Sequence, residues 1–295
     1  MMRSLYSGVS GLKNHQTRMD VIANNIANVN TVGYKTSRVV FQDIFSQTSR
    51  SAAAPSGVVG GTNPIQVGLG VILSAIDVIH TESAFARSDR PLDFMISGEG
   101  YFVIETPNET LYTRAGNFYI DDENYLVNSA GYYVLGFADD EPPTAAPPVY
   151  DPATPFIPDD LNRIKVAYED DDGNERRYMN ISVDKNGVVS GKNIDDEIEI
   201  IGYLSIATFN NTSGLEKAGG TNYRVSNNSG EPTIFLPNSR EIGSGEILAG
   251  GLEMSNVDLA NEFTDMIITQ RGFQANSRSI TVSDTLLEEL INLKR

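Results

Sequence analysis

The chain has 295 residues, of which 40% are hydrophobic and 21% charged, so it is long enough for two or three small domains. Its formal net charge of −17 argues against a nucleic-acid-binding protein, because neutralising phosphates requires clustered Lys and Arg. It contains no cysteine, which excludes disulfides, cysteine-ligated metals and thiol catalysis.

An apolar ladder with the 4-3 spacing of a coiled-coil seam runs through the N-terminal segment. Its members are Leu5, Val9, Leu12, Met19, Ala23 and Ile26, with the polar Gln16 at one position. This spacing predicts one long helix over residues 3–29, ended by Gly33. The last turns of that helix are crowded with asparagine, a poor helix former whose amide competes for backbone groups.

The amino-acid composition of the chain changes after this helix. Residues 46–63 are small, polar and glycine-rich, and we expect a linker over residues 36–69. From about residue 70, β-branched and aromatic runs alternate with turn signals, of which Asp172-Gly173 and Asn186-Gly187 are typical of hairpins. Residues 139–160 carry many prolines, so they are predicted as a loop at a domain boundary.

The C-terminal segment repeats the helical pattern. Apolar residues recur every seven positions at Leu259, Met266, Phe273, Ile280 and Leu287. We predict a second helix over residues 256–293, with Ser255 or Asn256 as its N-cap and a weak point at Gly272. The expected fold class is mixed α and β: the two terminal helices pair as a coiled coil, and the middle is all β, with one or two small β domains.

Few residues in the sequence indicate a catalytic or metal-binding site. The two histidines, His15 and His80, lack the further His or Cys ligands that a metal site needs and the partners of a catalytic triad. The acidic run at residues 168–179 does not fit a calcium loop, since Tyr168 and Met179 stand where acidic ligands are required. No apolar run approaches the roughly 18 residues of a membrane span. We therefore expect no enzyme, cofactor, metal or membrane span.

Four separated segments carry a specific resemblance. They are residues 4–35, with "VIANNIANVNTVGYK", residues 90–137, with "RPLDFMISGEGYFVIE", residues 204–232, and residues 250–294, with "GGLEMSNVDLANEFTDMIITQRGF". In this order they resemble the bacterial flagellar rod and hook family of axial proteins. One departure is Tyr101, where the family usually has Phe.

The resemblance implies nested domains and a route of export. The terminal helical domain, D0, is expected at residues 1–35 and 255–295, a β-rich D1 at 70–145 and 200–254, and a small inserted D2 at 146–199. Family members leave the cell through the flagellum's own export apparatus, without a cleavable signal peptide. The expected location is therefore extracellular, in the hook or basal body.

Within the family, residues 37–48 and 60–71 are similar to hook members rather than distal rod members. The expected function is a structural subunit of the hook, a flexible tubular joint that transmits torque. Its implied partners are further copies in a helical homopolymer, the rod protein below, the hook–filament junction protein above and the hook cap during assembly. A distal rod subunit is the alternative within the family, and a secreted β-rich adhesin is the alternative of another class.

A tube requires each helix pair to contact its neighbours, and amides can do so without burying a charge. We interpret Asn24, Asn25 and Asn28 as such lateral contacts, with Gln270, Gln274, Asn276 and Ser277 as partners. The alternative is that the asparagines only fray and end the helix. The residues predicted to mediate self-assembly are Leu5, Val9, Leu12, Met19, Ala23, Asn24, Asn25, Ile26, Asn28, Leu259, Met266, Gln270, Phe273, Asn276, Ile280 and Leu287.

Overall fold

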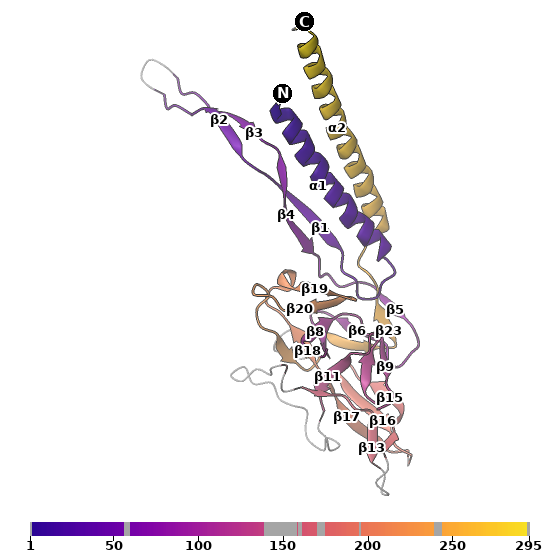
Figure 1. Ribbon diagram of the computed structural model, residues 1–295. Helices are drawn as coiled ribbons and strands as arrows, with labels where there is room; N and C mark the ends of the chain where they lie inside the picture. Colours follow the sequence, from indigo (N-terminus) through magenta and orange to yellow (C-terminus); the bar gives the residue numbers. More distant parts are fainter. Residues whose placement is uncertain are drawn as a thin grey trace. The chain divides into compact units, whose positions relative to one another are not determined.

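A computed structural model describes residues 2–55, 60–138, 158, 161–169, 175–194, 196–238 and 244–293 (Figure 1). The chain divides into two compact units. Unit 1 contains Met1–Asn28, Thr36–Ile79 and Val257–Arg295, and unit 2 contains Val29–Lys35 and His80–Asn256. The expected class, with helices at the two ends and a β-rich middle, is confirmed.

Unit 1 contains the two long helices, α1 (Met2–Ala27) and α2 (Leu259–Asn292), which lie side by side in opposite directions (Figure 1). The N-cap of α2 is Asp258, whose carboxylate accepts hydrogen bonds from the backbone N–H groups of Ala260 and Asn261. The predicted cap at Ser255 or Asn256 was therefore wrong by two or three residues. Helix α2 also continues without a break through the predicted weak point at Gly272.

An arm of four strands, arranged as two antiparallel pairs, completes unit 1. Strand β1 (Ser37–Asp43) pairs antiparallel with β4 (Val71–Val78), and β2 (Ser46–Arg50) pairs antiparallel with β3 (Ile65–Gly68). Nearly half of the segment expected as a linker, residues 36–69, thus belongs to strands. Sequence periodicity does not reveal β2, because all of its residues are exposed and no face of the strand is apolar.

Unit 2 is built from short antiparallel strands. One sheet has the order β15-β16-β17-β11-β7-β8-β20-β19, to which β9, β10, β12, β18 and β21 attach. The remaining pairs are β22 with β6, β23 with β5, and β13 with β14. A 3-10 turn, η2, covers Thr212–Gly214.

The strand bounds in unit 2 are β5 Phe85–Arg87, β6 Phe94–Ser97, β7 Tyr101–Glu105, β8 Thr110–Thr113, β9 Phe118–Ile120, β10 Leu126–Asn128, β11 Tyr133–Phe137, β12 Asn162–Arg163, β13 Ala167–Glu169, β14 Glu175–Arg177, β15 Met179–Val183, β16 Val188–Lys192, β17 Ile198–Leu204, β18 Ile206–Thr208, β19 Glu216–Gly219, β20 Asn222–Arg224, β21 Thr233–Phe235, β22 Glu246–Ala249 and β23 Gly251–Glu253.

The hairpin predicted at Asn186-Gly187 is confirmed: these residues join β15 to β16, and Gly187 has a φ of +75° that suits glycine. The turn predicted at residues 172–173 lies outside the described residues, although the flanking strands β13 and β14 do pair. The proline-rich loop at 139–160 also lies outside them, apart from residue 158. The D1 and D2 boundaries stay a prediction.

The core of unit 2 combines aliphatic side chains with a group of buried phenylalanines. Phe94, Phe102 and Phe118 have no exposed surface, and the rings of Phe102 and Phe118 meet edge to face with centroids 5.2 Å apart. Ile104 and Ile206 are buried in the same cluster. The alternating β-branched and aromatic runs of the sequence thus supply the inward side chains of this unit.

Candidate assembly surface

The contact between α1 and α2 is made largely by small and polar residues. A Cβ added to Gly11 would lie 2.6 Å from the Asn276 side chain, and one added to Gly272 would lie 2.6 Å from the His15 ring. These glycines therefore let the two helices approach closely. Near one end of the pair, the Ser4 and Ser283 hydroxyls are 3.5 Å apart.

The predicted seam is one residue out of register on α1. The residues that meet α2 are Ser4, Gly8, Gly11, His15, Arg18 and Asn25, opposite Ser283, Ile280, Asn276, Gly272, Asp265 and Glu262 respectively. Each ladder residue follows or lies near one of these and points about 100° away around the helix. The apolar ladder of α1 therefore lies beside the line of closest approach, where glycines permit close packing although they carry no apolar signal. Its role as a coiled-coil seam stays a prediction.

The structure places the predicted assembly residues mostly on the flanks of the helix pair. On α1, Leu5, Leu12, Met19 and Ile26 are half-buried, whereas Val9 is 53% exposed and Ala23 is exposed. On α2, Met266, Ile280 and Leu287 are half-buried, and Leu259, Gln270 and Phe273 are exposed. The two buried residues of α2 are instead Thr269 and Ser283. The role of all these residues in assembly stays a prediction.

Asn25 is the buried member of the asparagine cluster, with 1% of its surface exposed. Its amide Nδ2 donates to the Ser37 carbonyl (2.8 Å) and to Glu262 (3.1 Å), while its Oδ1 accepts from the Ser37 N–H (3.0 Å). The side chain thus joins α1 to the start of β1 and to α2. Burial raises the pKa of the Glu262 carboxyl, and the hydrogen bonds from Asn25 and Thr36 oppose that shift.

The other amides have different surroundings from those expected. Asn28 Nδ2 donates to the Asn24 carbonyl (2.9 Å) and to Asn24 Oδ1 (3.2 Å), which is a contact within the last turn of α1. Asn276 packs against Gly11, and Gln274 accepts from Arg271 at 3.4 Å. Lateral bonds from the asparagines to Gln270, Gln274, Asn276 and Ser277 of a neighbouring copy remain a prediction.

The arm packs on another face of α1. Asn14, itself buried, donates from Nδ2 to the Val71 carbonyl of β4 at 2.7 Å. The His15 ring meets Phe41 of β1 edge-on, with centroids 6.1 Å apart. Burial lowers the pKa of His15, and the nearby Arg18 lowers it further. Sequence reasoning missed these contacts, although a polar Asn14 in the middle of a predicted helix was a usable signal.

Much of the apolar surface of unit 1 faces outward. Among the described residues, Ile22 is its one fully buried apolar side chain. The exposed large apolar side chains of α2 and its C-cap are Leu259, Phe263, Ile267, Ile268, Phe273, Val282, Leu286, Leu290, Ile291 and Leu293. Those of the arm are Ile44, Phe45, Ile65, Val67, Val71, Ile72 and Ile76. We call these two sets the outer apolar surface.

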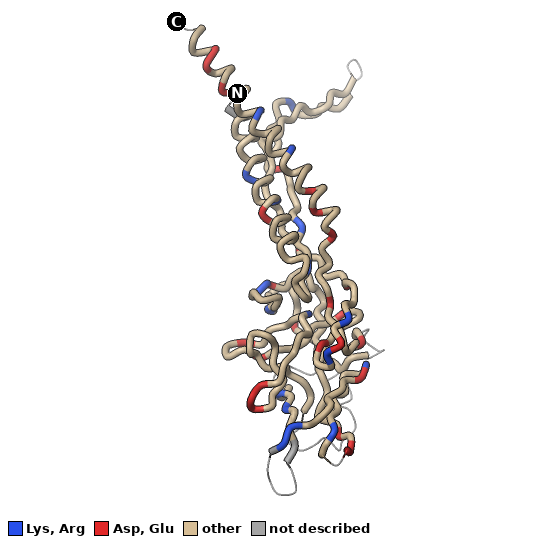
Figure 2. The backbone as a smooth tube through the Cα atoms, turned by 90° about the vertical axis from the view of Figure 1, so that its right-hand side faces the viewer, with Lys and Arg blue, Asp and Glu red and all other residues tan. Residues whose placement is uncertain are grey.

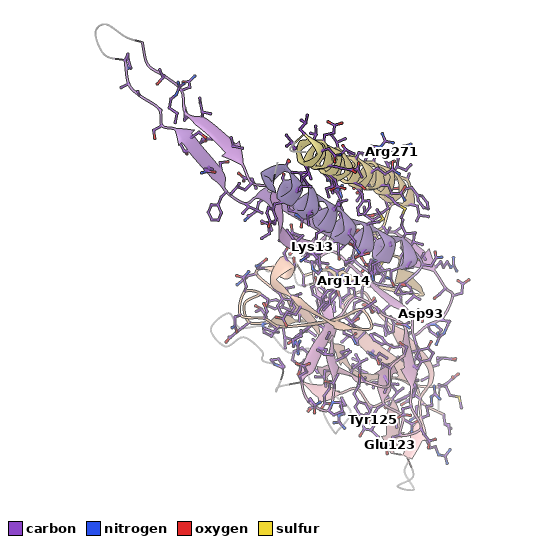
Figure 3. All side chains as sticks on the ribbon, turned by 45° about the horizontal axis from the view of Figure 1, so that its top comes forward. Lys13, Asp93, Arg114, Glu123, Tyr125 and Arg271 are labelled. Atoms are coloured by element: carbon purple, nitrogen blue, oxygen red, sulfur yellow. The ribbon has the colours of Figure 1, made fainter. Side chains whose placement is uncertain are left out.

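Charged residues interrupt this surface at intervals. Figure 2 shows them along both helices, separated by uncharged stretches. Lys13 on α1 and Arg271 on α2 are exposed (Figure 3), and Arg18 of α1 pairs with Asp265 of α2 at 3.0 Å. A helix pair with polar groups at its contact and many large apolar side chains exposed differs from an isolated soluble pair, which buries its apolar stripe.

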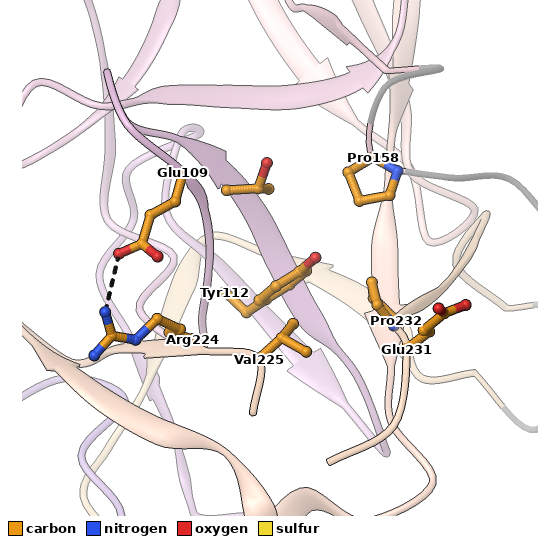
Figure 4. Close-up of a pocket in the computed structure, with 8 residues that line it drawn as sticks. Glu109, Tyr112, Pro158, Arg224, Val225, Glu231 and Pro232 are labelled. Atoms are coloured by element: carbon orange, nitrogen blue, oxygen red, sulfur yellow. Dashed lines mark ion pairs between the residues drawn. The ribbon is translucent and has the colours of Figure 1, made fainter. Parts of the chain in front are cut away.

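Unit 2 has a pocket of about 460 Å³ lined by Glu109, Thr110, Tyr112, Pro158, Arg224, Val225, Glu231 and Pro232 (Figure 4). Its Glu109 is paired with Arg224 at 3.7 Å, and burial raises the pKa of Tyr112. The described lining residues include no nucleophile beside a general base. No three His, Cys, Asp or Glu side chains are grouped for a metal ion in the described part of the chain. Neither described helix is long and apolar enough to cross a membrane.

Three family models match the chain. Residues 5–35 match the flagella basal body rod protein model, residues 95–191 match the flagellar hook protein FlgE/F/G D1 domain, and residues 248–293 match the flagellar basal body rod FlgEFG protein C-terminal model. These matches fall in both units and include both long helices.

Relatives match the chain from end to end. The flagellar basal-body rod protein FlgG of Bacillus subtilis is 46% identical over 296 aligned positions, which cover 100% of both chains. The flagellar hook protein FlgE of Borreliella burgdorferi is 32% identical over 443 positions, again covering 100% of both chains. The FlgG of that organism is 34% identical over 300 positions.

Proposed function

The chain belongs to the flagellar rod and hook family of axial proteins, and from this premise we propose that it is a subunit of the distal rod of the flagellar basal body. Members of the family are structural proteins, not enzymes, and they self-assemble into the axial structure of the flagellum. In the proposed role, copies of this chain form a helical tube that carries torque from the motor toward the filament.

The outer apolar surface of unit 1 is the observation that carries the proposal. Burying one Leu, Ile or Phe side chain stabilises a complex by about 2 kcal/mol. A neighbouring copy that covered half of the ten exposed apolar side chains of α2 and its C-cap would gain on the order of 10 kcal/mol, comparable with the cost of association. Contacts on several faces of the same unit favour a polymer over a closed dimer.

Alignment length and sequence identity both favour a rod subunit over a hook subunit. The sequence segments at 37–48 and 60–71 favoured a hook subunit, but the rod relatives support the other assignment. They align without large insertions, over 296 to 300 positions, and one of them is 46% identical. The hook relatives need 443 and 466 aligned positions, so they contain insertions that this chain lacks. A hook subunit, at 32% identity to those relatives, is the second candidate.

The proposed export route and the proposed neighbours follow from a position in the axial structure of the flagellum. Export through the flagellar apparatus would deliver the chain to the growing end, outside the cytoplasm. Its neighbours in the polymer would be copies of itself and, at the two ends of that polymer, other axial proteins. A secreted adhesin would have no use for the outer apolar surface on α2 and the arm.

Immunogold electron microscopy of isolated hook–basal bodies tests the proposal. The antibody is raised against residues 179–192, the β15–β16 hairpin, and immunoblotting of the same preparation establishes whether the chain is present. We expect gold on the straight shaft below the curved segment. Gold along the curved segment would transfer the assignment to the hook, and absence of the chain from the immunoblot would overturn both.

A further inference from the structure

The connections between the two units converge on a few residues of unit 2. The chain passes from one unit to the other four times, after residues 28, 35, 79 and 256. Within unit 2 the ends of these connections are residues 29–35, 80–84 and 253–256, which we call the connecting segments. Every crossing therefore begins or ends in one of three short pieces of chain.

Backbone hydrogen bonds tie the connecting segments to one another. The Gly33 N–H donates to the Glu253 carbonyl at 2.9 Å, and the Met254 N–H donates to the Ala84 carbonyl at 3.1 Å. The Ser83 hydroxyl donates to the Ser255 carbonyl at 2.8 Å. The three segments thus form one bonded group rather than three independent strands.

The carboxylate of Glu253 lies at the centre of this group. Its Oε1 accepts from Lys35 Nζ (2.6 Å) and from the Ser83 N–H (3.2 Å), and its Oε2 lies 3.5 Å from Arg114. Lys35 Nζ also donates to the Thr81 carbonyl at 2.6 Å. One side chain therefore contacts all the connecting segments, and the Lys35 and Glu253 side chains have no exposed surface.

Arg114 joins the group to the core of unit 2. Its guanidinium donates to the carbonyls of Ile96 (3.1 Å) and Gly98 (2.7 Å), which lie in and just after β6. It also lies over the Tyr101 ring at 5.3 Å and is 4% exposed. Figure 3 labels Arg114 among the strands of unit 2. The connecting segments are thus bonded to the sheet through Glu253 and Arg114.

Buried charges are an expensive means of holding segments together. Desolvating an ion pair costs several kcal/mol per ion, and well-packed apolar residues often stabilise a fold as well or better. A charged group nevertheless fixes direction, because its hydrogen bonds are short and oriented, whereas apolar contact is not directional. Burial lowers the pKa of Lys35, while its contact with Glu253 opposes that shift.

We propose that Glu253 is the clamp that holds all crossings between the units, so that load applied through unit 1 enters the β-rich unit at one cross-linked junction. Only the transmission of mechanical load in this inference rests on the proposed function. The clamp itself concerns residues of unit 2 in the unassembled chain, and it can be tested there.

Hydrogen exchange of the full-length, unassembled chain tests the clamp. The variant is Glu253→Gln, and the matched control is Glu246→Gln in β22, where the carboxylate forms a partly exposed pair with Lys185 at 3.7 Å. We expect exchange in the connecting segments to accelerate at least tenfold in Glu253→Gln, with β7 and β8 unchanged. Unchanged connecting segments, or an equal acceleration throughout unit 2, would overturn the clamp.

A second variant covers the case in which Glu253→Gln does not fold, since it leaves two buried cations without their carboxylate. Lys35→Met removes one arm and keeps the Arg114–Glu253 pair balanced. We expect faster exchange near residues 31–36 and retained protection at residues 254–256. Protection unchanged at both places would show that the Lys35 arm holds nothing.

Load is tested in cells that express the variant as their sole copy. We expect Lys35→Met to assemble but to lose swimming speed in viscous medium at least twofold more than Glu246→Gln does. Equal swimming speeds of the Lys35→Met and Glu246→Gln cells would overturn the transmission of load through the clamp, while leaving the clamp itself in place. A wild-type chain missing from hook–basal bodies would instead refute the proposed function, and the exchange results would still stand.

Discussion

The two units treat their apolar side chains in opposite ways. Among the described residues, unit 2 contains all the buried apolar side chains except Ile22, whereas unit 1 has most of the exposed large ones. Unit 2 has a closed core, while the helices of unit 1 meet through glycines, polar side chains and the Arg18–Asp265 ion pair. Under the proposed function, folding alone buries the apolar side chains of unit 2, whereas those of unit 1 become buried when copies assemble.

The largest expected effect is in the core of unit 2. Phe102 is fully buried against Phe118, so Phe102→Ala should lower the free energy of unfolding by about 4 kcal/mol. Urea denaturation followed by tyrosine fluorescence measures this change. A loss below about 1 kcal/mol would contradict the contrast between the units, since it would mean that this core contributes little.

Acid should also weaken unit 2. Burial, helped by Lys35, Arg114 and Lys217, lowers the pKa of His80 to about 4, from about 6.5 when unfolded. The folded state therefore binds fewer protons, and stability falls as the pH drops from about 6.5 toward 4, by about 3 kcal/mol in total.

The variant His80→Gln isolates this effect from other titrating groups. Glutamine can keep a hydrogen bond to the Tyr101 hydroxyl, which lies 2.7 Å from His80 Nδ1. Urea denaturation at pH 7.5 and 4.5 should show that the variant loses less stability than the wild type by about 2 kcal/mol. Identical losses in the two proteins would rule out His80 as the source.

A smaller effect is expected at the glycine contact of unit 1. Gly11→Leu forces a side chain into the space held by Asn276, so it should separate the helices at a cost of about 2 kcal/mol. Gly68→Leu is the control, because a Cβ there meets nothing within 4 Å. Protease cleavage within α1 should accelerate in Gly11→Leu alone. Equal cleavage rates in Gly11→Leu and Gly68→Leu would favour the apolar ladder over the glycine contact as the helix interface.

The smallest effect on stability should accompany a total loss of assembly. Phe263→Ala with Ile267→Ala removes exposed side chains of α2, so the free energy of unfolding should change by less than about 0.5 kcal/mol. Sedimentation of concentrated protein should nevertheless show no polymer, whereas Glu288→Ala still sediments. Normal polymers from the double variant would show that this part of α2 is not an interface.

Periodicity alone predicts the elements better than their contacts. The heptad spacing and the alternating runs correctly indicate two terminal helices and a β middle. The register of the helix contact depends on Gly8 and Gly11, which a count of apolar residues passes over. The pairing of Lys35 with Glu253 was also beyond prediction, because the two residues are 218 positions apart and no periodicity of the sequence connects them.

Among the described residues of unit 1, Ile22 alone is a buried apolar side chain, and under the proposed function this has a kinetic consequence. The first copies to meet cover only part of each other's outer apolar surface, yet they lose the full freedom of motion that association costs. An arriving copy that docks on an existing end is covered on several sides at once. Growth should therefore show a lag when pure protein is concentrated and none when preformed seeds are added. In a cell, the position of an existing end would then set where a tube begins.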